Sequence, residues 1–178
     1  MFCKYNFFFT FHFNMVGFST KTFEVFDDYM TPNEAWDLLL PFIPKDKVIW
    51  EAFYGDGNSG NYLSSLGLNV IHQNIDFFEN DLGDIIVSNP PFSLKKNVLQ
   101  RLKLLDKPFI LIMPCSTLTT NYVRELFSND IQIIVPPKRI QFIKLENGVL
   151  KQNNRCNFDC FFFCYKIGLD RDIVFIKK

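Results

Sequence analysis

The stretch that decides the fold is residues 48–60, which read VIWEAFYGDGNSG. Its apolar beginning predicts a short buried strand, the glycines at positions 55 and 57 predict a tight turn, and a helical pattern begins near Gly60. Such a turn lets the backbone approach a ligand closely, and the first N–H groups of the helix face an anion such as a carboxylate. The stretch is therefore typical of a nucleotide-type binding loop, with a purely structural turn as the alternative. No Gly-Lys-Ser/Thr follows, which disfavours a nucleoside triphosphatase.

Outward from this loop, short apolar runs alternate with segments of helical period. This pattern is typical of an α/β domain built on a mostly parallel sheet. The predicted strands are 48–52, 69–72, 84–88, 109–113, 131–135 and 158–165, and the predicted helices include 62–66, 94–105 and 122–127.

A further helix is predicted upstream of the loop. Thr31 is the expected N-cap, Pro32 takes the first helical position, and Glu34 follows three residues after the cap. The helix would carry an apolar face inward, made of Trp36, Leu39 and Leu40.

The length and composition indicate one domain. The chain has 178 residues, of which 48% are hydrophobic, enough for one sizeable core and too few residues for two ordinary domains. Residues 15–178 are the expected domain. Residues 1–14 are rich in Phe but lack a cleavage site and are too short to span a bilayer. We predict that they form a disordered extension, dispensable for catalysis.

Charge is divided unevenly along the chain. Residues 1–93 carry 4 Lys and Arg against 12 Asp and Glu, whereas residues 94–178 carry 15 against 7. A basic half can attract a polyanion, so nucleic acid is expected against the C-terminal part, although a plain scatter of solvated charges is the alternative. The candidate phosphate contacts are Lys95, Lys96, Lys138, Arg139, Lys144 and Arg155.

Five cysteines indicate reduced thiols rather than disulfides or a metal site. Cys156, Cys160 and Cys164 are spaced four apart in a predicted strand, which puts them on one face. No CxxC pair and no nearby His completes a ligand set. We therefore expect buried free thiols, no metal, and a reducing, cytoplasmic environment.

The segment most informative about function is Ser-Asn-Pro-Pro-Phe, residues 88–92, directly after the strand 84–87. Two prolines cannot continue a central strand and fix an extended, rigid path. The side-chain oxygen of Asn89 and the carbonyl of Pro90 can then act as two acceptors for an exocyclic NH₂ group. After Pro91, the ring of Phe92 offers a stacking face. The alternative is a strand exit whose Asn caps a turn.

These motifs together resemble the class I S-adenosylmethionine-dependent amino-methyltransferases, in particular N6-adenine methyltransferases of phage and restriction-modification type. The similarity runs from about Tyr29 to Tyr165. Residues 53–60 look like the family's cofactor loop, residues 29–32 like the segment that seats the methionine end, Asp76-Phe77 like the pair that holds the cofactor adenine, and residues 89–92 like the catalytic tetrapeptide.

The resemblance implies the fold, the cofactor and the site. The fold would be a Rossmann-like, mostly parallel seven-stranded sheet with helices on both faces and a last, antiparallel strand at 158–165. Residues 15–178 would form the methyltransferase catalytic domain, without a separate target-recognition domain. The implied catalytic residues are Asn89, Pro90, Pro91 and Phe92. The implied ligands of S-adenosylmethionine are Tyr29, Thr31, Pro32, Glu51, Phe53, Gly55, Gly57, Asn74, Asp76 and Phe77.

Two positions depart from the family pattern. Ala52 follows Glu51 where the family often has Pro. The strand 69–72 ends in Gln73 and Asn74, where an acidic residue usually binds the ribose hydroxyls. Either carboxamide could still bind a ribose, and Asp76 is the ribose ligand if the alignment slips by two residues.

The implied activity is methyl transfer to N6 of adenine in nucleic acid, with DNA favoured over RNA. A duplex acceptor base would have to be flipped out of its stack. Two alternatives stay open: methylation of a protein glutamine amide, which presents the same NH₂ group, and a catalytically silent subunit. The expected partners are a nucleic-acid substrate and a second protein subunit, with no membrane.

Overall fold

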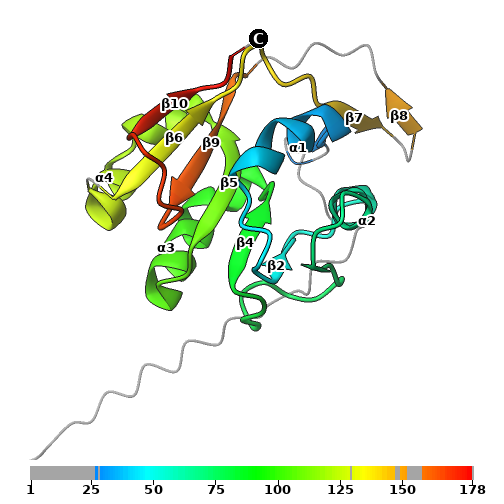
Figure 1. Cartoon of the computed structure of the whole chain (residues 1–178), viewed down its shortest axis with the longest axis horizontal. Helices are drawn as coiled ribbons and strands as arrows, with labels where there is room; N and C mark the ends of the chain where they lie inside the picture. Colours follow the sequence, from blue (N-terminus) through cyan, green and yellow to red (C-terminus); the bar gives the residue numbers. More distant parts are fainter. Residues whose placement is uncertain (1–26, 28, 129, 147–148, 152–157, 178) are drawn as a thin grey trace, which may run out of the picture.

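The computed structural model of the chain describes residues 27, 29–128, 130–146, 149–151 and 158–177. Three predictions lie outside these residues: the extension 1–14, the thiol of Cys156 and the basic contact Arg155. The described part places a central sheet between two layers of helices (Figure 1).

The central sheet has seven strands and is mostly parallel. They are β2 (Ile49–Trp50), β3 (Val70–Ile71), β4 (Ile85–Ser88), β5 (Phe109–Pro114), β6 (Ile131–Val135), β9 (Cys160–Tyr165) and β10 (Ile173–Phe175). Their order across the sheet is β10-β6-β9-β5-β4-β2-β3. β9 is antiparallel to β5 and to β6, and every other adjacent pair is parallel. The predicted α/β class and the antiparallel strand are confirmed.

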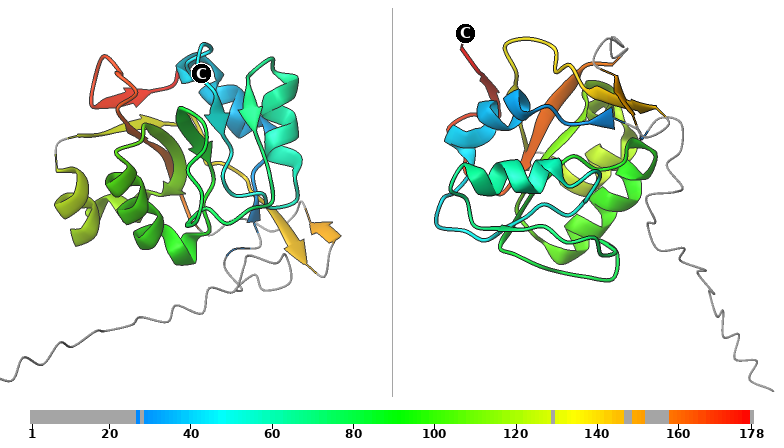
Figure 2. Two further views of the ribbon diagram at one scale, coloured as in Figure 1. Left: turned by 90° about the horizontal axis from the view of Figure 1, so that it is seen from below. Right: turned by 90° about the vertical axis from the view of Figure 1, so that its right-hand side faces the viewer.

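Four α-helices of the described chain cover this sheet, two on each face. α1 (Asn33–Leu39) and α2 (Asn58–Ser65) pack on one face, and α3 (Lys95–Leu105) and α4 (Asn121–Phe127) pack on the other (Figure 2). Short 3-10 turns lie at η1 (Leu40–Phe42), η2 (Phe92–Leu94) and η3 (Cys115–Thr119).

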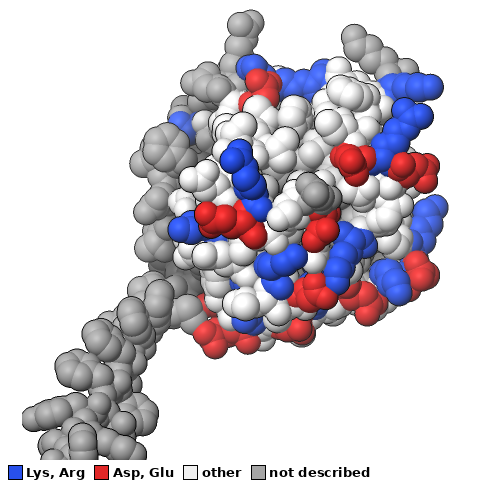
Figure 3. All heavy atoms as spheres, turned by 90° about the vertical axis from the view of Figure 1, so that its left-hand side faces the viewer, with Lys and Arg blue, Asp and Glu red and all other residues white. Residues whose placement is uncertain are grey.

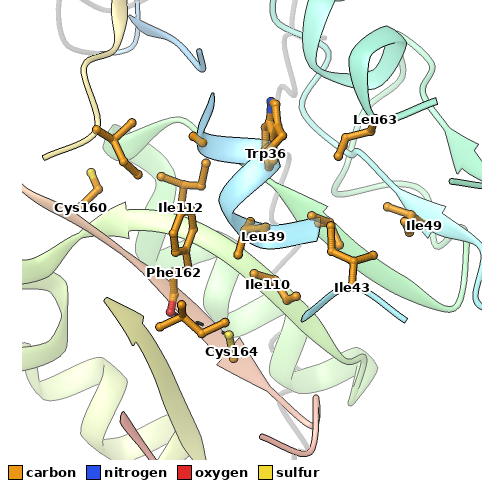
Figure 4. Packing of buried hydrophobic residues seen from close by; sticks show 14 of the residues in the cluster. Trp36, Leu39, Ile43, Ile49, Leu63, Ile110, Ile112, Cys160, Phe162 and Cys164 are labelled. Atoms are coloured by element: carbon orange, nitrogen blue, oxygen red, sulfur yellow. Dashed lines mark hydrogen bonds between the residues drawn. The ribbon is translucent and has the colours of Figure 1, made fainter. Parts of the chain in front are cut away.

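The central strands are buried on both faces because successive side chains alternate between the two helix layers. On β5, Ile110 and Ile112 belong to the same buried cluster as Trp36 of α1 (Figure 4). Leu111, between them, belongs to the opposite cluster with Leu102 of α3. This two-sided burial explains why the strands are almost continuously apolar in the sequence.

A second, smaller sheet lies apart from the main one (Figure 1). It consists of β1 (Tyr29–Met30), β7 (Ile143–Glu146) and β8 (Val149–Lys151), all antiparallel, in the order β1-β7-β8. These strands were not predicted. Their pairing brings the segment before α1 against residues more than one hundred positions later in the chain.

Three local predictions were wrong. Thr31 does not cap α1: Pro32 occupies the N-cap position, and proline has no side-chain group that could form a capping bond. The hydroxyl of Thr31 accepts a hydrogen bond from Asn89. α2 begins at Asn58 rather than near Gly60. The antiparallel strand β9 is not the last one, since β10 follows it and adds a parallel edge beside β6.

The prediction of buried, reduced thiols is confirmed for the two described cysteines of β9. Cys160 and Cys164 are both buried, and neither forms a disulfide. Burial raises the pKa of Cys164 to about 12, which keeps this thiol protonated and unreactive.

The different burial of two phenylalanines predicts different effects on stability. Phe162 of β9 is fully buried, whereas Phe175 of β10 is 71% exposed. Phe162→Ala should lower the free energy of unfolding by about 3–5 kcal/mol, because it removes a ring from a packed core. Phe175→Ala, the matched control, should change it by about 0.5 kcal/mol or less. Urea denaturation measures both, and equal effects would contradict the described packing.

Candidate active site

The predicted site segments gather at one edge of the main sheet. β3, β2 and β4 are adjacent and parallel, so their carboxyl ends meet at the same edge. The glycine turn follows β2, residues 72–78 follow β3, and residues 89–92 follow β4. Segments that are separate in the sequence are thereby brought together where open parallel sheets form their binding sites.

The glycine turn combines left-handed backbone with a capped helix start. Gly55 and Gly57 have φ angles of 55° and 85°, which residues with a Cβ rarely adopt. Asp56 accepts hydrogen bonds from the backbone N–H of Asn58 (3.0 Å) and from its side-chain amide (2.5 Å). The loop therefore supplies part of the cap of α2 itself.

His72 is packed tightly between the glycine turn and α2. Its ring stacks on Tyr54, with a centroid distance of 4.6 Å and an interplanar angle of 11°. A Cβ at Gly60 would lie 2.0 Å from the imidazole, so only glycine lets α2 approach the end of β3 this closely. The Nε2 atom of His72 is buried and has no hydrogen-bond partner in the described part of the chain.

Beneath the turn, a buried carboxylate joins three adjacent strands. Glu51 directly follows β2 and is 1% exposed. One of its oxygens accepts a hydrogen bond from the hydroxyl of Ser88, the last residue of β4. The other lies 2.7 Å from Nδ1 of His72, which directly follows β3. The structure thus places Glu51 inside the protein rather than on the surface of the site. One oxygen accepts a hydrogen bond from Ser88, and the other lies close to His72 without hydrogen-bond geometry.

Glu51 and His72 influence each other's protonation. Burial raises the pKa of Glu51, although hydrogen bonds from His72 and Ser88 act in the opposite direction. Burial acts to lower the pKa of His72, but its hydrogen bond and charge interaction with Glu51, helped by the backbone of Gly57, outweigh burial and raise it. The pair therefore keeps a proton to higher pH in the folded chain than in the unfolded chain.

Asn89 has one side-chain oxygen without a protein partner. Its Nδ2 atom donates to Oγ1 of Thr31 at 3.0 Å, which fixes the plane of the carboxamide. Oδ1 is buried and accepts no hydrogen bond from any described residue. The described hydrogen bonds also leave the carbonyl of Pro90 unused, whereas that of Pro91 accepts from the N–H of Leu94 at 3.0 Å. Buried acceptors are rarely left unpaired unless a ligand or water completes them.

Phe92 belongs to an aromatic cluster. Its ring centroid lies 5.2 Å from that of Phe158 and 6.3 Å from that of Phe142, both edge to face. Phe158 also meets Tyr29 edge to face at 5.3 Å. The cluster joins the β4 exit to β1 and to the loops before β7 and β9. The two loops contact the Phe92 ring directly, and β1 supports it through Phe158. Stacking of Phe92 on a planar acceptor stays a prediction.

Asp76 and Phe77, predicted to bind the cofactor adenine, differ in their burial. Asp76 is partly exposed, and its Oδ1 accepts a backbone N–H two residues later at 2.7 Å. Phe77 is buried against Trp50 (5.6 Å) and Phe53 (5.0 Å). Phe77 therefore supports Phe53 of the glycine turn from below. Asn74 lies exposed after β3.

A cleft of about 900 Å³ opens beside Thr31. The starts of α1 and α2 form one side of it, and residues 138–143 form the other. Asn89 adjoins the cleft through its hydrogen bond to Thr31 without lining it. The charges around the cleft are mixed, because Glu34 and Asp56 line it together with Lys138. Its volume is in the range of ligand-binding sites.

The predicted basic contacts differ in how far they are engaged within the protein. Lys95 donates to the carbonyl of Phe92 at 3.0 Å, and Arg139 makes a bidentate pair with Asp159 at 2.6 and 3.0 Å. Lys138 is exposed and lines the cleft with Arg139. The other described candidates are Lys96, exposed on α3, and Lys144, partly buried in β7.

The face of the molecule in Figure 3 offers no surface of a single charge. Lys and Arg alternate there with Asp and Glu. Ion pairs such as Lys103 with Asp130 and Lys107 with Asp81 contribute to the mixture on the α3 side of the sheet. Nucleic acid that binds through phosphate contacts would therefore use another face.

Sequence reasoning missed His72 and Ser88. Each stood at the end of a predicted strand, next to residues that received a role, and Ser88 opens the segment 88–92 but was assigned no function. The signal was position: Ser88 ends β4 and His72 directly follows β3, the two strands that flank β2. Their connection through Glu51 requires the strand order, which the sequence alone does not give.

Comparison with known proteins assigns no family. No protein-family model matches the chain, and no curated protein matches it. Within the ranges that the structure describes, no helix is long and apolar enough to cross a bilayer, and no group of three or more His, Cys, Asp or Glu side chains could hold a metal ion. Function must therefore be inferred from the site itself.

The Glu51–His72 pair predicts a pH dependence of stability. The folded-state pKa of His72 is raised above its ordinary value of 6.5. The stability linked to its proton is therefore fully present below pH 6.5 and is lost as the pH rises through the folded-state pKa. Thermal unfolding followed by circular dichroism from pH 6 to 9 should show the midpoint falling over this range.

Glu51→Gln is the matched control for this titration. Glutamine can still accept the hydrogen bond from Ser88, but it has no charge to raise the pKa of His72. The difference between the unfolding midpoints of wild type and Glu51→Gln should therefore shrink as the pH rises. Curves that stay parallel throughout would contradict the coupling.

Proposed function

We propose that the chain is a Rossmann-like class I methyltransferase that transfers a methyl group from S-adenosylmethionine to the exocyclic N6 of adenine in nucleic acid, with DNA preferred to RNA. One observation carries the proposal: the carboxamide of Asn89 is fixed by Thr31, and its buried oxygen has no partner in the described chain. The motif order along the chain and the sheet that brings the motifs to one edge support it.

The residues at the sheet edge fit the proposed cofactor. Gly55 and Gly57 have no side chains of their own, and the ring of Tyr54 and the sulfur of Met30 lie beside them. Asp76, partly exposed, would offer a carboxylate to the amino group of the cofactor adenine, and Asn74, exposed, would offer a carboxamide to its ribose. Thr31 and its neighbour Pro32 line the cleft and would hold the methionine end. When bound, S-adenosylmethionine supplies a methyl group that is already activated on a sulfonium.

The acceptor amine would be held by two oxygens of the β4 exit. Oδ1 of Asn89 and the carbonyl oxygen of Pro90 each accept one N–H of the exocyclic NH₂ group. Hydrogen bonding of both protons draws the nitrogen lone pair out of conjugation with the ring and directs it at the methyl carbon. Rate enhancement then comes mainly from positioning.

No general base is assigned. Glu51 is 1% exposed, accepts a hydrogen bond from Ser88 and lies against His72, so it does not reach an acceptor. Asn89 and Pro90 would orient the acceptor nitrogen, S-adenosylmethionine would supply the methyl group, and the proton released from the nitrogen would go to water. The role of the protein is to bind and orient the two reactants and to shield them from solvent.

A second acceptor, the side-chain amide of a protein glutamine, is favoured by one observation. The cleft beside Thr31 is lined by Glu34 and Asp56 as well as by Lys138, and Arg139 is neutralised by Asp159. A phosphate backbone gains little from such a surface, whereas a peptide tolerates it. The same two oxygens at the β4 exit would orient a glutamine NH₂ group.

Two measurements test the proposed function. Mass spectrometry of nucleosides after expression in a methylation-deficient host should show N6-methyladenine. Incubation with S-adenosylmethionine labelled in its methyl group, together with nucleic acid or protein, then assigns the acceptor. Label found only in protein would mean that the methyl acceptor is a glutamine side chain and not adenine. Failure of the chain to bind S-adenosylmethionine in calorimetry would make it a catalytically silent relative and overturn the proposal.

Asn89 gives the sharpest mutational prediction. Asn89→Ala should lower kcat by roughly a hundredfold or more, because it removes an oriented group that acts on the acceptor in the transition state. Its Kd for S-adenosylmethionine should stay within about threefold of wild type, since the side chain faces the acceptor. Calorimetry and single-turnover transfer measure the two quantities.

The control is Thr31→Val, which keeps the shape of Thr31 and removes only the oxygen that accepts from Nδ2 of Asn89. It frees the carboxamide to rotate, so kcat should fall by roughly tenfold, less than in Asn89→Ala. Equal losses of cofactor binding and of transfer in Asn89→Ala would place this side chain at the donor and refute its assigned role.

A further inference from the structure

Glu51 is too deeply buried to contact a cofactor directly. It is 1% exposed, one oxygen accepts from Ser88, and the other lies 2.7 Å from His72. Ser88 is itself fully buried and directly precedes Asn89 in the chain. A carboxylate so enclosed cannot touch a ligand at the sheet edge unless this packing opens.

The same carboxylate connects the two halves of the proposed site. Through Ser88 it reaches the β4 exit, where Asn89 would hold the acceptor. Through His72 it reaches the glycine turn, because the imidazole stacks on Tyr54 at 4.6 Å and packs against Gly60. Glu51 itself ends β2, which lies between β3 and β4. Three strand ends are thus tied at a single buried group.

Burial of this group has a physical cost that calls for a role. Removing a carboxylate from water is unfavourable unless hydrogen bonds and a partner charge compensate it. Ser88 supplies a hydrogen bond to one oxygen, and His72, when protonated, places a positive charge 2.7 Å from the other. An apolar residue at position 51 would avoid the cost but would leave the hydroxyl of Ser88 without its acceptor.

We propose that Glu51 is a positioning residue, which acts through Ser88 to hold Asn89 and through His72 to hold the glycine turn, so that the donor and acceptor subsites keep a fixed separation. This inference rests on the proposed methyl transfer and deepens it. It replaces direct cofactor binding, the role expected for Glu51 from the sequence, by an indirect one. A shift of about 1 Å in such a geometry is enough to slow transfer strongly.

Ser88→Ala is the decisive variant, because it removes one hydroxyl from the network and leaves the volume of the buried site almost unchanged. If Glu51 positions Asn89, kcat should fall by roughly tenfold, while the Kd for S-adenosylmethionine and the KM for the acceptor change by less than about threefold. Ser64→Ala is the matched control, since the hydroxyl of Ser64 bonds only to Gly60 of its own helix. This control should leave all three quantities at their wild-type values.

A second readout does not depend on activity. The side-chain amide protons of Asn89 should give a resolved signal in a ¹⁵N–¹H spectrum of the full chain, because Nδ2 is hydrogen-bonded to Thr31. Ser88→Ala should shift or broaden this signal, whereas Ser64→Ala should not. Glu51→Gln can still accept a hydrogen bond from Ser88. This variant should therefore keep the wild-type Asn89 signal and at least about a third of wild-type kcat.

The outcomes separate this inference from the proposed function. A raised Kd for S-adenosylmethionine in Glu51→Gln, with normal kcat in Ser88→Ala, would make Glu51 a cofactor ligand and overturn the positioning role. An unmoved Asn89 signal in Ser88→Ala would overturn it as well. If wild type transfers no methyl group to any acceptor, the proposed function fails, and the Asn89 signal alone still decides whether Ser88 controls that side chain.

Discussion

One hydrogen bond, from Nδ2 of Asn89 to Oγ1 of Thr31, determines what the candidate site can do. Because the amide nitrogen is committed to Thr31 at 3.0 Å, the side-chain oxygen is left buried and unpaired at the carboxyl end of β4. A carboxamide free to rotate could present either atom, and only the oxygen can receive an amine proton. The bond also ties the segment before α1 to the end of β4, and the hydrogen bonds from Ser93 to the carboxylate of Asp27 join the same two parts of the chain.

The surrounding structure keeps this carboxamide in place. The parallel pairs β3-β2 and β2-β4 bring three loops to one edge, and Glu51 ties those strand ends together from below. On the other side, the aromatic cluster around Phe92 and Phe158 holds the residues that follow Asn89. The proposed chemistry needs this rigidity, because a donor that is already activated leaves the protein with positioning as its main task.

The sequence predicted the fold well where one rule was sufficient. Short apolar runs located the six strands β2 to β6 and β9, and glycine and proline positions located the turns at Gly57 and Pro90. It failed where tertiary contacts compete with local rules. Thr31 has the features of a helix cap, yet Asn89, far away in the sequence, takes its hydroxyl. The small strands β1, β7 and β8 are stabilised by pairing with one another, and β10 by pairing with β6, so their sequences carry little signal of their own. Glu51 was predicted to be a cofactor ligand because its burial depends on the order of the strands, which the sequence does not give.

The central claim concerns two oxygens that converge on one amine. A crystal structure of the chain with S-adenosylhomocysteine and an adenine-containing oligonucleotide tests it most directly. The account predicts that Oδ1 of Asn89 and the carbonyl oxygen of Pro90 each lie about 2.7–3.2 Å from N6 of an extruded adenine, with Nδ2 of Asn89 still on Thr31. An adenine bound elsewhere, or a carboxamide whose oxygen has turned toward Thr31 and away from the base, would contradict it.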